Sequence, residues 1–198
     1  MLDPILIIKS FGLLGIFLIV FIESGLLVGF FLPGDTLLFA SGIFASQGFF
    51  SISLLVLGAS ICAILGDNFG YWTGKKFGRK LFERSNSTFF NKERVYQAER
   101  FYEKYGRMSI VMARFVPVVR TFAPIIAGVA NMPYKIFFIY NIIGGILWVS
   151  LVSLLGYYFG SLIPNIDSFL FPIFIFVIVL SFSPFIVKFA HKYTKKFF

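Results

Sequence analysis

The chain has 198 residues, of which 58% are hydrophobic and only 14% are charged. Soluble domains are typically about 45–50% apolar and about 25% charged, so this composition predicts a polytopic membrane protein and excludes an ordinary soluble domain. The net charge of +9 does not indicate nucleic-acid binding, because most basic residues flank apolar segments and would face anionic lipid headgroups there.

The first two predicted elements are a membrane helix over residues 5–27 and a hairpin over 28–48. No basic region or small-residue cleavage pattern marks the N-terminal run as a signal peptide. The second segment is interrupted by Pro33, Gly34 and Asp35, which favour a turn. Irregular backbone at membrane depth must be buried in protein or line a cavity, so we expect a re-entrant hairpin here.

Residues 51–74 predict a second membrane helix, because their apolar run is long enough to cross the bilayer. A basic segment, 75–107, follows. Within it, residues 92–105 have apolar side chains at helical spacing, and Gly106 can end such a helix. An amphipathic helix on the membrane surface is expected, with a solvated helical linker as the alternative.

The second half of the chain predicts another hairpin and two more membrane helices. Residues 108–130 contain Arg114, Pro117 and Arg120, which are unsuited to a simple span and favour a second re-entrant hairpin. The apolar runs 134–163 and 168–190 predict membrane helices.

The placement of Lys and Arg predicts the orientation of these elements. Basic residues concentrate in 75–107 and at the C-terminal end, whereas the predicted loops near 46–52 and 163–168 contain none. The positive-inside rule then makes both termini cytoplasmic. The first hairpin would open outside and the second inside, so the two units would have inverted topology.

Glycines recur at one fixed separation in the two halves. Four pairs lie 86 residues apart: Gly42 and Gly128, Gly58 and Gly144, Gly70 and Gly156, and Gly74 and Gly160. Many transporters form a central site from duplicated apolar halves with matching interruptions. We therefore predict one all-α membrane domain, 1–198, with an inverted repeat over about 28–74 and 108–163. The alternative is that glycine is simply abundant, since membrane helices tolerate it.

Several charged residues fall within apolar segments, among them Glu23, Asp35, Asp67, Arg114 and Arg120. A charge at the centre of a membrane helix costs about 2.5–3.5 kcal/mol on insertion scales, so such residues usually pair or serve a pathway. If the hairpins meet, Glu23 and Asp35 lie near both arginines. Arginine binds phosphate through two parallel hydrogen bonds, so we predict that Arg114 and Arg120 hold a lipid phosphate.

The acids are predicted counter-ions, and protonation of Glu23 or Asp35 would free an arginine for substrate. The alternative is a set of static ion pairs that hold the hairpins together. Asp67 is predicted to be a further counter-ion. The alternative for Asp67 is that it caps a helix or snorkels to the membrane surface near a helix end.

Three further residues, Tyr71, Asn141 and Trp148, are candidates for either packing or function. The sequence contains no Ser/His/Asp set, no carboxylate–histidine cluster and no phosphate-binding loop, so we expect neither an enzyme nor a metal or cofactor. Its single cysteine, Cys62, excludes an intramolecular disulfide and is expected to be a packing residue.

These motifs resemble those of the DedA family of bacterial membrane proteins, whose eukaryotic relatives carry the VTT domain. The resemblance covers about residues 20–160. It rests on the segments 31–38, 66–74 and 114–120, together with Ala127, Gly128, Met132, Asn141, Gly144 and Trp148.

The resemblance implies an inverted-repeat fold with two facing re-entrant hairpins in the bacterial cytoplasmic membrane. It also implies lipid transport, because family members include undecaprenyl-phosphate translocases, and relatives resemble phospholipid scramblases. Proton dependence is implied as well. The family's essential acids would correspond to Glu23 and Asp35, and its essential arginines to Arg114 and Arg120.

We therefore predict a transporter of undecaprenyl phosphate or of a phospholipid, with membrane lipids and protons as partners and no nucleic acid. Homo-oligomerisation stays open. One alternative is a proton-coupled transporter of small ions or drugs that uses the same carboxylates. The other is a membrane scaffold that transports nothing.

Overall fold

The computed structural model describes residues 4–26, 32, 34–78 and 106–162. Every regular element in these ranges is helical: α1 (Pro4–Gly25), α2 (Gly34–Ser46), α3 (Ile52–Thr73), the π-helical turn η2 (Gly74–Gly78), the 3-10 turn η3 (Gly106–Met108), α6 (Ser109–Ala113), α7 (Pro117–Val129) and α8 (Tyr134–Leu162). Pro33, the predicted surface helix 92–105 and the predicted C-terminal helix 168–190 lie outside the described residues.

Two of these helices are long and apolar enough to cross a membrane. They cover Ile52–Phe77 and Tyr134–Leu162, where the sequence predicts membrane helices. Large apolar side chains recur at helical spacing along one face of the first and remain about half exposed: Leu54, Leu57, Ile61 and Leu65. An apolar face of this kind is suited to contact with lipid tails rather than water.

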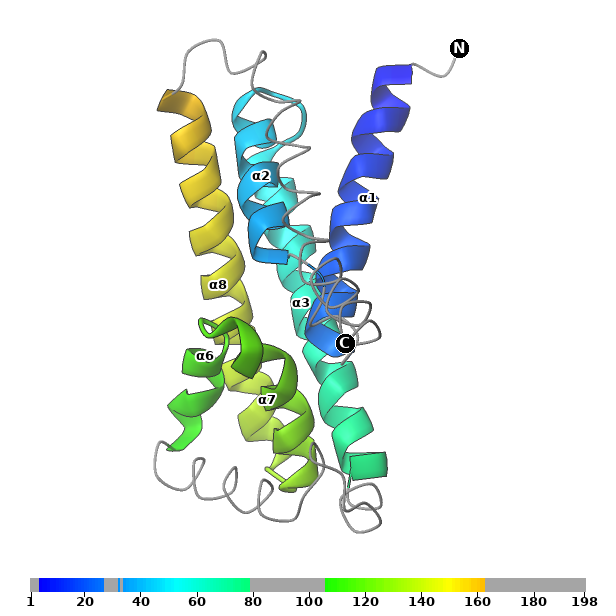
Figure 1. Cartoon of the computed structure of the whole chain (residues 1–198), viewed down its shortest axis with the longest axis vertical. Helices are drawn as coiled ribbons and strands as arrows, with labels where there is room; N and C mark the ends of the chain where they lie inside the picture. Colours follow the sequence, from blue (N-terminus) through cyan, green and yellow to red (C-terminus); the bar gives the residue numbers. More distant parts are fainter. Residues whose placement is uncertain (1–3, 27–31, 33, 79–105, 163–198) are drawn as a thin grey trace, which may run out of the picture.

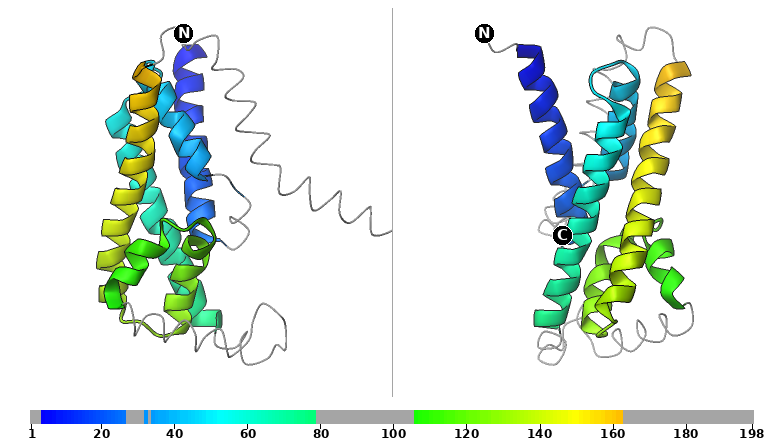
Figure 2. Two further views of the ribbon diagram at one scale, coloured as in Figure 1. Left: turned by 60° about the vertical axis from the view of Figure 1, so that its left-hand side comes forward. Right: turned by 180° about the vertical axis from the view of Figure 1, so that it is seen from behind.

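The two long helices, α3 and α8, contact each other, and the shorter helices pack around them. α1 and α7 both pack on α3, α7 also contacts η2, and α2 packs mainly on α8. Figure 1 shows α2 in the upper half of the molecule and α6 and α7 in the lower half, with the N-terminal ends of α2 and α7 toward the middle. Figure 2 shows α1 diverging from α3 toward its N-terminus.

The interruptions at Gly34 and Pro117 coincide with the starts of the two short helices. α2 begins at Gly34 and carries Asp35 in its first turn, where a carboxylate interacts favourably with the helix dipole. α7 begins at Pro117, a position where the missing N–H of proline has no cost. Residues 114–116 form the turn between α6 and α7. Arg120 therefore lies in the first turns of α7.

Several of the repeated glycines lie where a short helix crosses a long one. A Cβ on Gly42 of α2 would fall 2.1 Å from the carbonyl oxygen of Ser153 in α8, and a Cβ on Gly128 of α7 would fall 2.1 Å from that of Tyr71 in α3. In the opposite direction, a Cβ on Gly156 would meet the Phe39 oxygen at 2.0 Å. Small residues allow such close approach of backbones between helices.

The main apolar core lies between α1, α2, α3 and α8. It consists of Val20, Leu38, Ala59, Ala63, Trp148 and Val149. A second cluster contains Tyr71, Ile110, Ala127 and Phe137, where α3, α6, α7 and α8 meet. The polar groups described below lie beside these apolar clusters.

Candidate functional site

Every carboxylate in the described part of the chain is paired with one of two arginines. Arg120 pairs with Glu23 and Asp35, and Arg114 pairs with Asp67. We call Glu23, Asp35, Arg120 and Trp148 the first cluster, and Asp67, Arg114 and Asn141 the second cluster.

The first cluster joins four helices through the guanidinium of Arg120. Its Nη1 donates a hydrogen bond to Asp35 Oδ1 of α2 at 2.6 Å, and its Nη2 donates to Glu23 Oε1 of α1. The guanidinium carbon lies 4.5 Å from the centroid of the Trp148 ring of α8. The Trp148 indole N–H donates at 2.8 Å to the same oxygen, Asp35 Oδ1.

Gly34 creates the space that Glu23 occupies. A Cβ at position 34 would lie 1.4 Å from Glu23 Oε2, so no larger residue fits without displacing the carboxylate. The N-terminal end of α2 is also a favourable place for a negative charge, because the helix dipole points its positive end there. The sequence Gly34-Asp35 thus brings two carboxylates together. Glu23 packs against Gly34, and Asp35 belongs to the first turn of α2.

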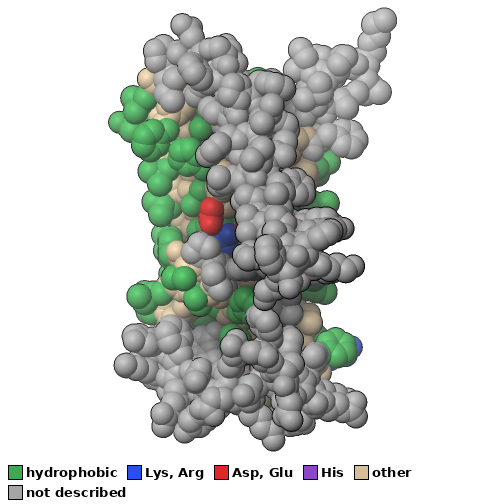
Figure 3. Space-filling model, in the orientation of Figure 1, with side chains coloured by type: hydrophobic (Ala, Val, Ile, Leu, Met, Phe, Trp, Pro, Cys, Tyr) green, Lys and Arg blue, Asp and Glu red, His purple; other side chains and the backbone are tan. Residues whose placement is uncertain are grey.

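Access to the first cluster is through Asp35. Its side chain is 41% exposed, whereas those of Glu23 and Arg120 are only 3% and 7% exposed. Figure 3 shows acidic and basic atoms beside one another at mid-height of this face, near apolar side chains. Of the acids that the structure describes, Asp35 alone is not buried.

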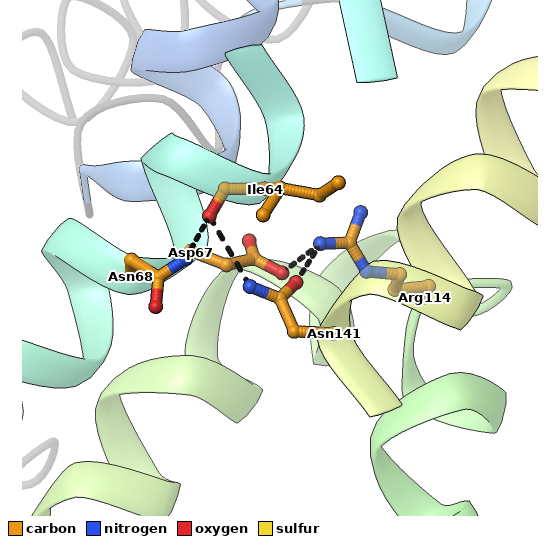
Figure 4. A network of polar contacts seen from close by, with 5 residues as sticks. All are labelled: Ile64, Asp67, Asn68, Arg114 and Asn141. Carbon is orange, nitrogen blue, oxygen red and sulfur yellow. Dashed lines mark hydrogen bonds and ion pairs between the residues drawn. The ribbon is translucent and has the colours of Figure 1, made fainter. Parts of the chain in front are cut away.

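The second cluster is buried and links the two long helices to the turn after α6. Arg114 Nη2 donates to Asp67 Oδ2 of α3 and to Asn141 Oδ1 of α8. The amide of Asn141 in turn donates to the carbonyl oxygen of Ile64 at 3.2 Å, and Asn68 donates to that same oxygen at 2.7 Å (Figure 4). Arg114 and Asp67 are each 4% exposed, so the pair is shielded on all sides.

Two adjacent glycines of α8 accommodate Arg114. A Cβ on Gly144 would fall 2.9 Å from Arg114 Cδ, and one on Gly145 would fall 3.3 Å from Nη1. Gly144 is a member of the glycine repeat and of the family motif, whereas Gly145 was not among the residues predicted from the sequence. The glycine doublet between Asn141 and Trp148 in a long apolar helix was the available signal.

Both arginines retain an unused hydrogen-bond donor. Nε of Arg114 and Nε of Arg120 are buried and have no acceptor among the described residues. A guanidinium offers five N–H groups in a planar fork, which matches the oxygens of a carboxylate or a phosphate. Arg120 therefore has donor capacity beyond its two acids.

The structure brings most of the predicted site residues into these clusters, in an arrangement that the sequence did not specify. Glu23 and Asp35 both meet Arg120, whereas Arg114 lies with Asp67. Asn141 and Trp148 each contact an arginine. Pro117 begins α7.

Tyr71 stands apart from both clusters. Its hydroxyl donates to the carbonyl oxygen of Met132 and its ring stacks on Phe137 at 4.5 Å, which is a packing arrangement. In the described ranges, no group of three or more His, Cys, Asp or Glu side chains is suited to a metal ion.

Comparison with known proteins assigns the family. The VTT domain family model matches residues 32–158, well over half of the chain. Protein DedA of Escherichia coli (strain K12) is 43% identical over 175 residues, covering 87% of this chain and 80% of the relative. An uncharacterized membrane protein of Mycobacterium leprae is 39% identical over 175 residues, covering 88% and 78%.

A more distant relative, an uncharacterized membrane protein of Synechocystis, is 31% identical over 156 residues, with 78% of this chain and 70% of the relative covered. No solved structure matches the chain. The matched segment contains Asp35, Asp67 and both arginines, and two helices of the structure can span a bilayer. The chain therefore belongs to the VTT-domain, or DedA, family of membrane proteins.

Proposed function

We propose that this protein translocates a lipid with an anionic phosphate headgroup across the bacterial cytoplasmic membrane. Undecaprenyl phosphate is the first candidate and a phospholipid the second. The observation that carries the proposal is the first cluster, in which a half-exposed carboxylate, Asp35, covers a buried guanidinium with a spare donor. A phosphate that replaces Asp35 on Arg120 would gain charge-assisted hydrogen bonds of the strongest kind.

The charge count supports coupling to protons. Three carboxylates face two guanidiniums, so the two clusters together carry one net negative charge when all five groups are ionised. Binding of a phosphate anion would make this net charge more negative, in surroundings of low polarity. Proton uptake by Glu23 or Asp35 would offset the added charge and release Arg120, because a protonated acid holds a guanidinium less strongly.

The helix contacts support an inverted-repeat transport architecture. In each half a short helix that begins near the middle of the molecule packs, through glycine, on the long helix of the other half. Transporters with inverted repeats expose a central site to either side by rocking one repeat against the other. We propose that α2 and the α6–α7 pair are the inner arms of two re-entrant hairpins, with both termini of the chain cytoplasmic.

The proposed cycle involves no covalent chemistry, so the protein would act as a transporter and not as an enzyme. The lipid tail would remain in the bilayer while the phosphate moves between the two sides on Arg120. Exposed apolar side chains next to this arginine, such as Val116 and Val119, are compatible with a neighbouring lipid chain.

The proposal is tested by measuring lipid translocation in proteoliposomes for undecaprenyl phosphate and for phosphatidylethanolamine. We expect movement of undecaprenyl phosphate that Arg120→Ala abolishes without loss of folded protein. Lys135→Ala is the matched control, because it removes an exposed basic side chain that lies outside both clusters. Movement of both lipids would identify a general scramblase. Full transport by Arg120→Ala would contradict the proposed phosphate site.

A further inference from the structure

Trp148 contacts both members of the accessible ion pair, and it does so with two different parts of its side chain. The indole N–H donates to Asp35 Oδ1 at 2.8 Å, and the ring face lies 4.5 Å from the guanidinium carbon of Arg120. Asp35 Oδ1 thus accepts from the indole and from Arg120 Nη1 at the same time. The ring itself is 2% exposed and is held in the apolar core beside Leu38 and Val149.

This arrangement matters when the ion pair opens. If Arg120 turns from Asp35 to another anion, Asp35 keeps the indole donor and so does not lose its last partner. Arg120 can pivot over the aromatic face while it keeps its cation–π contact, because that attraction depends on the ring as a whole rather than on one atom. Both charges stay near their original positions while the bond between them is broken.

We propose that Trp148 is a positioning residue that holds Asp35 and Arg120 in place while their ion pair opens to admit the substrate phosphate. This inference rests on the proposed function. Tryptophan is the side chain suited to the task, since it combines a large aromatic face with a single N–H donor. Phenylalanine would keep the face and lose the donor, and leucine would lose both.

The first test is the initial rate of undecaprenyl-phosphate translocation. Loss of a hydrogen bond to a charged group corresponds to about a tenfold change or more, so we expect Trp148→Phe to slow translocation by about that factor. Trp148→Leu should reduce it to the level of Arg120→Ala. A wild-type rate for Trp148→Phe would overturn the proposal.

The second test does not depend on transport and uses the fluorescence of the tryptophan itself. The chain has two tryptophans, and the other, Trp72, is 66% exposed. In Trp72→Phe, all tryptophan emission therefore comes from Trp148. We expect a saturable change in this emission when undecaprenyl phosphate in detergent micelles is added, and no such change in Trp148→Phe, where only Trp72 emits.

Two further comparisons separate the possible failures. Adding Asp35→Asn to Trp72→Phe should shift the emission in the absence of lipid, because the charged acceptor of the indole is removed. An unchanged spectrum would overturn the inference.

If the wild type moves no undecaprenyl phosphate, the proposed function fails, and the Asp35→Asn spectrum still reports on the contact between Trp148 and Asp35. If Trp148→Phe does not fold, the lipid titration of Trp72→Phe decides, and an emission unaffected by lipid counts against the proposal.

Discussion

At the scale of single residues, the two arginines occupy different environments. Arg114 is enclosed with Asp67 and Asn141 between the two long helices. Arg120, in contrast, pairs with Asp35, whose side chain is partly exposed. Removing one partner of a buried ion pair leaves an uncompensated charge and typically costs about 3–5 kcal/mol. Removing the half-exposed Asp35 costs less, because Arg120 keeps Glu23 as its partner.

The first prediction follows from this difference. Asp67→Ala should lower the free energy of unfolding by about 3–5 kcal/mol, because it leaves Arg114 buried without its carboxylate. Asp35→Ala should abolish lipid translocation with a much smaller loss of stability. Thermal unfolding in detergent and translocation in proteoliposomes measure the two effects. Equal destabilisation by the two substitutions would show that the first cluster is also a static structural pair.

The second prediction concerns Gly34. Gly34→Ala should displace Glu23 from Arg120, because the new Cβ would lie 1.4 Å from Glu23 Oε2, and translocation should be lost. Gly12→Ala is the control, since a Cβ there would meet nothing within 4 Å. Shortening the acid in the double variant Glu23→Asp/Gly34→Ala should restore part of the activity. Normal activity of Gly34→Ala alone would mean that the contact between Glu23 and Arg120 is dispensable.

At the scale of elements, the crossings of α2 on α8 and of α7 on α3 depend on glycine. The backbones approach so closely that a methyl group would overlap a carbonyl oxygen of the partner helix in both places. Asp35 lies in the first turn of α2 and Arg120 near the start of α7. The packing of these two short helices therefore helps to set the geometry of the first cluster.

The third prediction tests this packing. Gly42→Ala and Gly128→Ala should each destabilise the protein by about 1–3 kcal/mol, the usual cost of overpacking a close contact. Gly12→Ala should be neutral or stabilising by up to about 1 kcal/mol, because alanine favours the helix more than glycine does. The midpoint of thermal unfolding in detergent compares the three variants. A neutral effect at Gly42 would show that α2 can shift away from α8 freely.

At the scale of the whole molecule, the proposed inverted arrangement predicts which turns face which side of the membrane. The turn between α2 and α3 contains Gln47 and Gly48, and Gly48 has a φ of +78°, a left-handed conformation that favours glycine. The turn between α7 and α8 contains Asn131. The two turns lie at opposite ends of the long helices, as Figure 1 shows.

The fourth prediction uses this separation. In a Cys62→Ser background, which removes the chain's single cysteine, Gln47→Cys should react with a membrane-impermeant maleimide from outside the cell. Asn131→Cys should react only after the membrane is permeabilised. Labelling of both positions from the same side would contradict the proposed topology, and the reverse pattern would invert the orientation.

The local features of this protein could be predicted from its amino-acid pattern. Apolar runs of sufficient length predicted α3 and α8. The sequence predicted breaks at Gly34 and Pro117, because proline and glycine act on the backbone beside them, and α2 and α7 begin at these two residues. Charged residues such as Glu23 and Arg120 within apolar segments also marked the polar site, because the cost of inserting a charge into the membrane requires a partner for it.

Which charges meet depends on how the helices pack together. Glu23 and Arg120 are far apart in the chain, and their contact depends on how α1 and α7 are rotated and placed against α3, which no local pattern encodes. The same reason explains why Asp67 proved to be the partner of Arg114, and why Gly145 proved to give that arginine room. The indole of Trp148 reaches Asp35 only because glycine lets α2 pack directly on α8.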